Sequence, residues 1–169
     1  AEAYNFRGSA YQNKKDSRRA LADFNKAIEL NPALDAAYLN RGSFYEAAGE
    51  LDRALADYEK ALQINPNLAD IYYRRANAYL IKKDHERALA DYNKVIELKP
   101  NYAEAYYKRG DIYYALKKDQ KLAFEDYNKT IELNPNIADA YLKRGNIYYA
   151  NREDYDNAVN DYSKAIELN

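Results

Sequence analysis

The sequence predicts an all-α fold built from five repeated pairs of helices. Four prolines, Pro32, Pro66, Pro100 and Pro135, are separated by 34, 34 and 35 residues. Each closes a similar phrase, DFNKAIELNP, DYEKALQINP, DYNKVIELKP or DYNKTIELNP, and DYSKAIELN ends the chain. Self-similarity at such a period is the signature of a repeat architecture. We therefore expect a single array of five units, with bounds at 1–34, 35–68, 69–102, 103–137 and 138–169.

The first half of each unit carries tyrosines at helical spacing. They recur at Tyr4, Tyr38, Tyr72, Tyr106 and Tyr141, and again seven residues later at Tyr11, Tyr45, Tyr79, Tyr113 and Tyr148. Small residues lie between them, where the absence of bulk lets a neighbouring helix approach: Gly8, Gly42, Ala76, Gly110 and Gly145. A second apolar stripe follows, in the first unit at Ala20, Phe24, Ala27 and Leu30. Spacings of three and four are helical, so each unit is predicted to be two helices.

Turn signals separate the predicted helices. The stretches KKDS, AGELD and KKDH supply Asp or Ser as N-caps, and each proline ends a second helix because it lacks an N–H. The fourth and fifth units carry one extra residue, since Gly110 and Ala123 are 13 apart where Gly8 and Ala20 are 12 apart. The simplest interpretation is a longer surface turn.

On these residues the unit resembles the tetratricopeptide repeat, a 34-residue helix-turn-helix with a pattern of aromatic, Leu-Gly, Tyr, Ala, aromatic, Ala and Pro. Two departures are the replacement of the frequent Trp by Tyr and of the Leu before the small residue by Arg, in all five units. The resemblance implies a right-handed superhelical solenoid of antiparallel helix pairs. It also implies a concave groove lined by the first helices, which binds peptides or partner proteins and performs no catalysis.

Five arginines and five aspartates form parallel columns: Arg7, Arg41, Arg75, Arg109 and Arg144, with Asp23, Asp57, Asp91, Asp126 and Asp161. Their separation rises from 16 to 17 where the turn lengthens, so the aspartate keeps its register on the helix and not a fixed distance along the chain. We therefore predict a charge-assisted, bidentate pair within each unit. The alternative is an arginine ladder that binds phosphates or acidic tails; pairing is favoured because it lets a half-buried Arg be tolerated.

Composition argues against several functions. The 26 Lys and Arg balance 27 Asp and Glu, which disfavours nucleic acid and anionic membranes as partners. The chain has no cysteine, and its only histidine, His85, lies in a turn without a second ligand or nucleophile. We expect no enzyme and no catalytic, metal or cofactor-binding residues. The sequence has no apolar run of membrane-spanning length, so we expect a cytoplasmic protein. It does not begin with Met, which suggests a segment excised from a longer protein.

Four further tyrosines, Tyr73, Tyr107, Tyr114 and Tyr149, fall on the first-helix face that the resemblance places in the groove. Nearby polar residues complete the predicted peptide groove: Arg74, Asn77, Lys108, Asp111, Lys143 and Asn146. Tyrosine offers contact area at low entropic cost, so we expect the groove to bind an extended or helical segment. The alternative is that these tyrosines only fill space between adjacent repeats.

A different class of function is a structural or assembly scaffold, natural or engineered. The last unit ends at AIELN with no following helix to cover its apolar residues, which are Ala158, Tyr162, Ala165, Ile166 and Leu168. Terminal repeats need a polar cap to shield such a face. We therefore expect self-association through the terminal repeats. RNA binding by a related helical-hairpin repeat is disfavoured by the proline phrase and the balanced charge.

Overall fold

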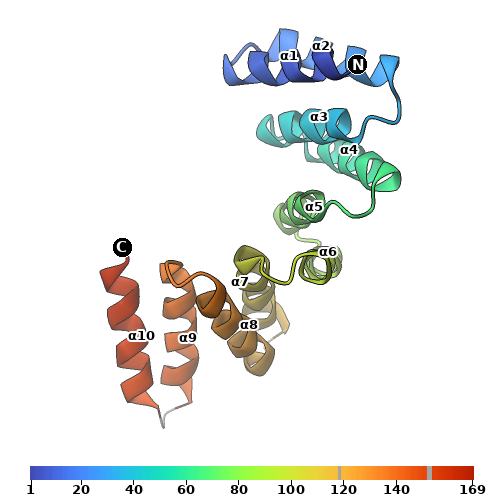
Figure 1. The fold of residues 1–169 in the computed structure, drawn as a ribbon. Helices are drawn as coiled ribbons and strands as arrows, with labels where there is room; N and C mark the ends of the chain where they lie inside the picture. The colour runs from blue at the N-terminus through green and yellow to red at the C-terminus, as the bar shows by residue number, and fades with distance from the viewer. Residues whose placement is uncertain (118, 152–153) are drawn as a thin grey trace. The chain divides into compact units, whose positions relative to one another are not determined.

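The structure, a computed structural model, describes residues 1–117, 119–151 and 154–169, and in these ranges it consists of ten α-helices and one short π-helix. Their bounds are α1 Glu2–Asn13, α2 Ser17–Leu30, α3 Asp35–Ala47, α4 Leu51–Ile64, α5 Ala69–Ile81, α6 His85–Leu98, α7 Ala103–Ile112, η1 Tyr113–Lys117, α8 Gln120–Leu133, α9 Ala138–Ala150 and α10 Tyr155–Glu167. Consecutive helices pack as antiparallel pairs, for example α3 with α4 and α9 with α10 (Figure 1). The all-α prediction is confirmed.

The predicted Asp cap is found at the start of α2 but not at the start of α4, where Asp52 lies inside the helix and the preceding Glu50 makes no side-chain cap bond. The side chain of Asp16 accepts the backbone N–H of Arg19 at 3.1 Å, and Asp119 does the same for Leu122 at 3.0 Å. α2 ends at Leu30, and the next residue, Asn31, adopts an extended conformation with φ of −145°. The residue before a proline is driven out of the helical region by the proline ring, so Pro32 explains this ending.

The predicted small-residue column marks where the two helices of a pair come closest. A Cβ added at Gly42 would lie 2.8 Å from Cε1 of Tyr58, and one at Gly8 would lie 2.7 Å from Cε1 of Phe24. Both rings are fully buried. The aromatic residue of each second helix therefore lies against a bare backbone in these two pairs, as the sequence predicts.

The chain divides into two compact units, Ala1–Asp91 and Tyr92–Asn169, and the boundary falls inside α6. In the first unit a core cluster consists of Ala54, Tyr58, Ala61, Leu62 and Ile71. In the second unit a cluster consists of Ala123, Tyr127 and Ile147, with Tyr107, Tyr113, Tyr114 and Phe124 packed against it. Each unit thus has its own hydrophobic centre.

The extra residue of the fourth helix pair is accommodated by a widened helical turn. The N–H of Asp119 donates to the carbonyl of Tyr113, six residues earlier, whereas Asp84 donates to Tyr79, five residues earlier. The intervening residues Tyr113–Lys117 form the π-helix η1. The extra residue of the fourth pair therefore does not simply lengthen a surface turn, as the sequence predicts, because it also widens the last helical turn before α8. The matching insertion in the fifth pair falls beside residues 152–153, outside the described residues.

In the part of the chain that the structure describes, no helix combines the length and the apolar character that a membrane span requires.

Candidate peptide-binding surface

All five arginines of the predicted column form bidentate ion pairs with the predicted aspartates. Arg41 donates from Nε to Asp57 Oδ2 at 2.8 Å and from Nη2 to Oδ1 at 2.7 Å. The other four pairs have the same geometry, with distances of 2.7 to 2.9 Å. The pairing prediction is confirmed. It disfavours the alternative of a phosphate-binding ladder, because each guanidinium already binds a carboxylate of the protein.

The pairs differ in their environment. The side chain of Arg7 is 57% exposed, whereas that of Arg41 is 21% exposed. The bond from Arg7 lowers the pKa of Asp23. Burial instead raises the pKa of Asp126, even though Arg109 opposes this effect. The same motif therefore carries a larger desolvation cost where it is more deeply buried.

The first-helix face of the unit 1–91 contains two polar networks. Tyr58 donates its hydroxyl to Oε2 of Glu46 at 2.5 Å, and Nη1 of Arg74 lies 3.5 Å from the same oxygen. On the neighbouring helices, Nδ2 of Asn40 donates to Asn5 Oδ1 at 2.9 Å and to Ser9 Oγ at 3.3 Å. Sequence reasoning missed Asn5, Asn40 and Glu46, because their partners lie on other helices.

The ten predicted groove residues fall into two sets. Tyr73, Arg74 and Asn77 belong to the unit 1–91, on α5. Tyr73 and Asn77 are half-buried, and Arg74 is exposed beside Glu46 of α3. The other seven residues belong to the unit 92–169 and come from α7, η1 and α9.

In the second unit, hydroxyl groups from the second helices hold polar side chains of the first helices. The hydroxyl of Tyr127 donates to Asp111 Oδ1 at 2.9 Å, and Nζ of Lys143 lies 4.0 Å from that oxygen. The hydroxyl of Tyr162 donates to Asn146 Oδ1, also at 2.9 Å. Three predicted groove residues are therefore already oriented by contacts within the protein.

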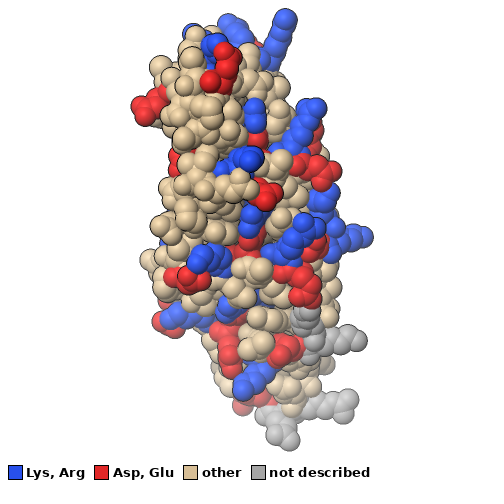
Figure 2. All heavy atoms as spheres, turned by 90° about the vertical axis from the view of Figure 1, so that its right-hand side faces the viewer, with Lys and Arg blue, Asp and Glu red and all other residues tan. Residues whose placement is uncertain are grey.

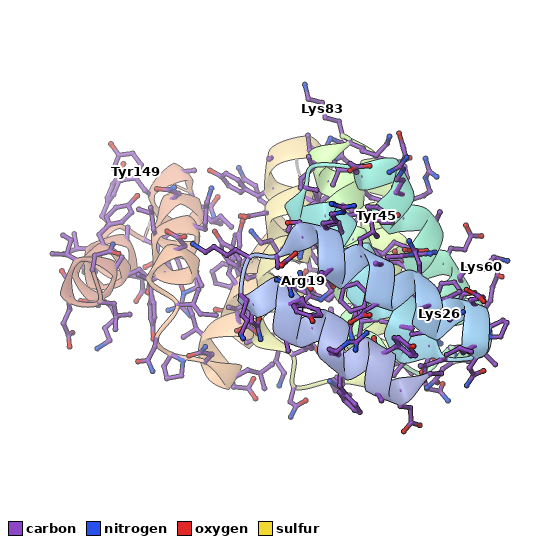
Figure 3. The ribbon with its side chains drawn as sticks, turned by 90° about the horizontal axis from the view of Figure 1, so that it is seen from above. Arg19, Lys26, Tyr45, Lys60, Lys83 and Tyr149 are labelled. Atoms are coloured by element: carbon purple, nitrogen blue, oxygen red, sulfur yellow. The ribbon has the colours of Figure 1, made fainter. Side chains whose placement is uncertain are left out.

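The predicted groove tyrosines do not all lie at the surface. Tyr107 and Tyr114 are half-buried and pack against the cluster around Tyr127; the centroids of the Tyr107 and Tyr127 rings are 6.1 Å apart. Burial is the main cause that raises the pKa of Tyr107, and Asp111 adds to it. Tyr149 differs, because it is 60% exposed (Figure 3). Tyr107 and Tyr114 thus fill space between helices, and Tyr149 offers open contact area.

Charged side chains of both signs occur on the protein, and one cation lies beside a tyrosine of the predicted groove. Nζ of Lys108 lies 5.4 Å from the centroid of the Tyr107 ring. On the face shown in Figure 2, basic and acidic side chains are interspersed. Among the described residues, no group of three or more His, Cys, Asp or Glu side chains could hold a metal ion.

Antiparallel helix pairs with repeated aromatic, small and proline positions define a helical repeat protein. Models of the tetratricopeptide repeat match residues 1–34, 36–68, 57–90, 103–137 and 138–169, and a further model described as TPR repeat matches residues 76–117. The chain belongs to the tetratricopeptide repeat family, whose members are typically non-catalytic scaffolds for protein interaction.

Solved structures with this fold include MamA, which is 27% identical with a TM-score of 0.85 over 95% of this chain and 93% of its own. YrrB, described as a TPR protein with an unusual peptide-binding site, is 26% identical with a TM-score of 0.79 over 98% of this chain and 84% of its own. PilF of Pseudomonas aeruginosa is 22% identical, with a TM-score of 0.85 over 99% and 76% of the two chains, and shares the fold. A comparison with curated proteins found no match.

Proposed function

We propose that the protein is a non-catalytic module that binds an extended or helical segment of a partner protein on the face of its first helices. The observation that carries this proposal is the fixed polar surface of α7 and α9, where tyrosine hydroxyls orient Asp111 and Asn146. A surface whose side chains are already ordered loses less entropy when a ligand binds. The peptide-binding site described for YrrB supports the same use of this fold.

The chemistry of this surface suits a peptide backbone. Asp111 accepts hydrogen bonds, and the Nδ2 group of Asn146 donates one while its Oδ1 is occupied by Tyr162. These groups match the N–H and C=O of an extended chain. The exposed ring of Tyr149 adds apolar contact area. We propose further that Lys108, Asp111, Lys143, Asn146 and Tyr149, all within the unit 92–169, contribute to one binding surface.

Selection of random peptides on the immobilised protein tests this proposal. We expect enriched peptides to bind with a dissociation constant on the order of micromolar, measured by fluorescence anisotropy. Tyr149→Ser should weaken binding about five- to tenfold because an exposed aromatic contact is lost. Lys60→Ala on α4 is the matched control at another exposed position and should have no effect (Figure 3). Equal losses in both variants, or no enrichment at all, would contradict the proposal.

A second candidate function is self-association through α10. Val159 is 60% and Ile166 is 77% exposed, whereas the residues at the same register in α6 and α4, Leu89 and Leu62, are 8% and 7% exposed. In the internal pairs this face packs against the first helix of the next pair, as α4 does against α5. We propose that the first helix α1 of a second copy covers α10.

The exposed side of α1 fits this arrangement. Phe6 is 70% exposed, and Arg7 is the most exposed arginine of its column. Sedimentation velocity should show association that increases with concentration, and Ile166→Glu should shift the protein to monomer. Leu30→Glu, at an exposed position on α2, is the control. A monomer at every concentration would contradict this second candidate and leave the peptide-binding proposal untouched.

A further inference from the structure

A cleft of about 680 Å³ lies between the beginning of α8 and the end of α9, and none of the ten predicted groove residues is among its described lining. These two helices pack against each other within the second unit (Figure 1). Binding pockets for small ligands typically enclose about 300 to 1,000 Å³. The cleft is therefore large enough to take a complete side chain with its flanking backbone.

The wall of the cleft is aromatic. Phe124 and Tyr148 meet edge to face with their centroids 5.2 Å apart, and Ile147 completes the apolar part of the wall. Phe124 comes two residues before Asp126, and an aliphatic residue stands at the equivalent position of every other pair. These residues are Leu21, Leu55, Leu89 and Val159. The fourth pair is thus the one with an aromatic ring at this position.

The cleft lies beside the widened turn of the fourth pair. Gln120, which begins α8, follows directly after Asp119, whose N–H closes the wide turn back to Tyr113. Gln120 and Asn151, at the two helix ends, are both exposed and both line the cleft. Each amide side chain can donate and accept, which is the complement of a peptide group.

The charge of the described lining is balanced. Lys121 and Asp154 contribute one charge of each sign, and Asp154 accepts a hydrogen bond from Asn157 at 2.7 Å. The described lining therefore has no net charge that would favour a cationic or an anionic ligand. Aromatic walls favour a ring or a branched apolar side chain, and aromatic rings pack with about 4.5 to 7 Å between their centroids.

We propose that this cleft is a second binding site, which takes one large uncharged apolar side chain of a partner peptide together with its two flanking backbone amides. The site goes beyond the proposed groove, because it lies between other helix ends and uses none of the ten groove residues. A partner segment that reaches both sites would bind more tightly than either contact alone allows.

N-acetyl-tryptophanamide is a suitable probe, because it carries an uncharged aromatic side chain with both backbone amides. The chain contains 20 tyrosines and no tryptophan, so indole fluorescence excited at its red edge reports the probe alone. Titration with the protein should raise the probe's anisotropy in a saturable manner, with a dissociation constant on the order of millimolar. Anisotropy that stays flat up to the solubility limit of the protein would overturn the proposal.

Two variants locate the binding. Phe124→Ala removes the ring from the wall of the cleft and should weaken probe binding about tenfold. Phe124→Leu introduces the leucine that the first three pairs carry at this position, so the fold should tolerate it. Phe124→Leu should weaken probe binding less than Phe124→Ala does. If circular dichroism shows that the alanine variant is unfolded, the leucine variant replaces it in the test. Tyr149→Ser is the control for the groove. Binding that survives both Phe124 variants, or that Tyr149→Ser abolishes, refutes the cleft as the site.

Discussion

The guanidinium of Arg41 joins two consecutive helix pairs. Its Nη1 donates to Asn25 Oδ1 of α2 at 2.7 Å, while Nε and Nη2 hold Asp57 of α4. The same bond recurs from Arg109 to Asn93 and from Arg144 to Asn128, at 2.7 Å each. The arginine that replaces the family's usual leucine thus links its own pair and the pair before it. Two helix pairs share one cation, which makes their packing interdependent.

Replacing Asp57 by Ala should destabilise the protein by about 3 kcal/mol, because Arg41 is left half-buried without its carboxylate. Asp23→Ala is the matched comparison, since Arg7 makes the same two bonds to its aspartate but has a largely exposed side chain. Asp23→Ala should reduce the free energy of unfolding clearly less, because solvent replaces the lost partner of Arg7. Urea unfolding followed by circular dichroism measures both; equal losses would show that burial does not set the strength of the pair.

Gly42→Ala should destabilise the protein by about 1 kcal/mol. The added Cβ would lie 2.8 Å from Cε1 of Tyr58, whose ring is fully buried, so the α3–α4 pair must separate slightly. The higher helix propensity of Ala offsets part of this cost. At Gly110 the nearest ring atom is 3.0 Å away, so Gly110→Ala should cost less. A gain in thermal stability of Gly42→Ala would contradict this explanation of the small-residue column.

Lys83→Gly should stabilise the protein by about 1 kcal/mol. Lys83 has a φ of 61°, in the left-handed region that costs an L-residue energy and a glycine almost none. Gly49 occupies the equivalent turn of the second pair with a φ of 77°. The side chain of Lys83 extends away from the ribbon, so its removal takes away no packing (Figure 3). Lys83→Ala, which keeps the strain, should show no gain in the melting temperature.

Stability should fall when the protein is acidified through the carboxylate range. The hydrogen bond from the Arg87 side chain lowers the pKa of Asp84, and the bond from Arg7 lowers that of Asp23. A carboxylate with a lowered folded-state pKa stabilises the protein above its ordinary pKa of about 3.9 and loses this contribution as the pH falls through the folded value. The urea midpoint should therefore be level near neutral pH and decrease below about pH 4.

Oδ1 of Asp84 caps α6 by accepting the backbone N–H of Arg87 at 3.1 Å. Asp84→Asn tests this assignment, because the amide oxygen can still cap α6 but does not titrate. The variant should lose less stability between neutral and acidic pH than the unmodified protein does. An unchanged pH profile would show that Asp84 does not contribute to the acid transition.

The sequence by itself determined the helix pairs and the Arg–Asp pairs, and it located the cap of α2 but not that of α4. These features depend on spacing along the chain: a residue three or four positions on shares a helix face, and the aspartates kept their register when the turn lengthened. The small-residue column was predictable for the same reason, because a small residue that recurs at one position of the first helix marks where a neighbouring helix can approach closely.

Only the tertiary structure decided which polar groups meet across helices. The bonds from Tyr127 to Asp111 and from Arg41 to Asn25 depend on the angle and distance between neighbouring helices, which no spacing in the sequence specifies. The same packing half-buries Tyr107 and leaves Tyr149 exposed, although both are predicted to lie on the first-helix face. Helix formation is local and can be read from periodicity, whereas the exposure of a given side chain is set by the helices that pack beside it.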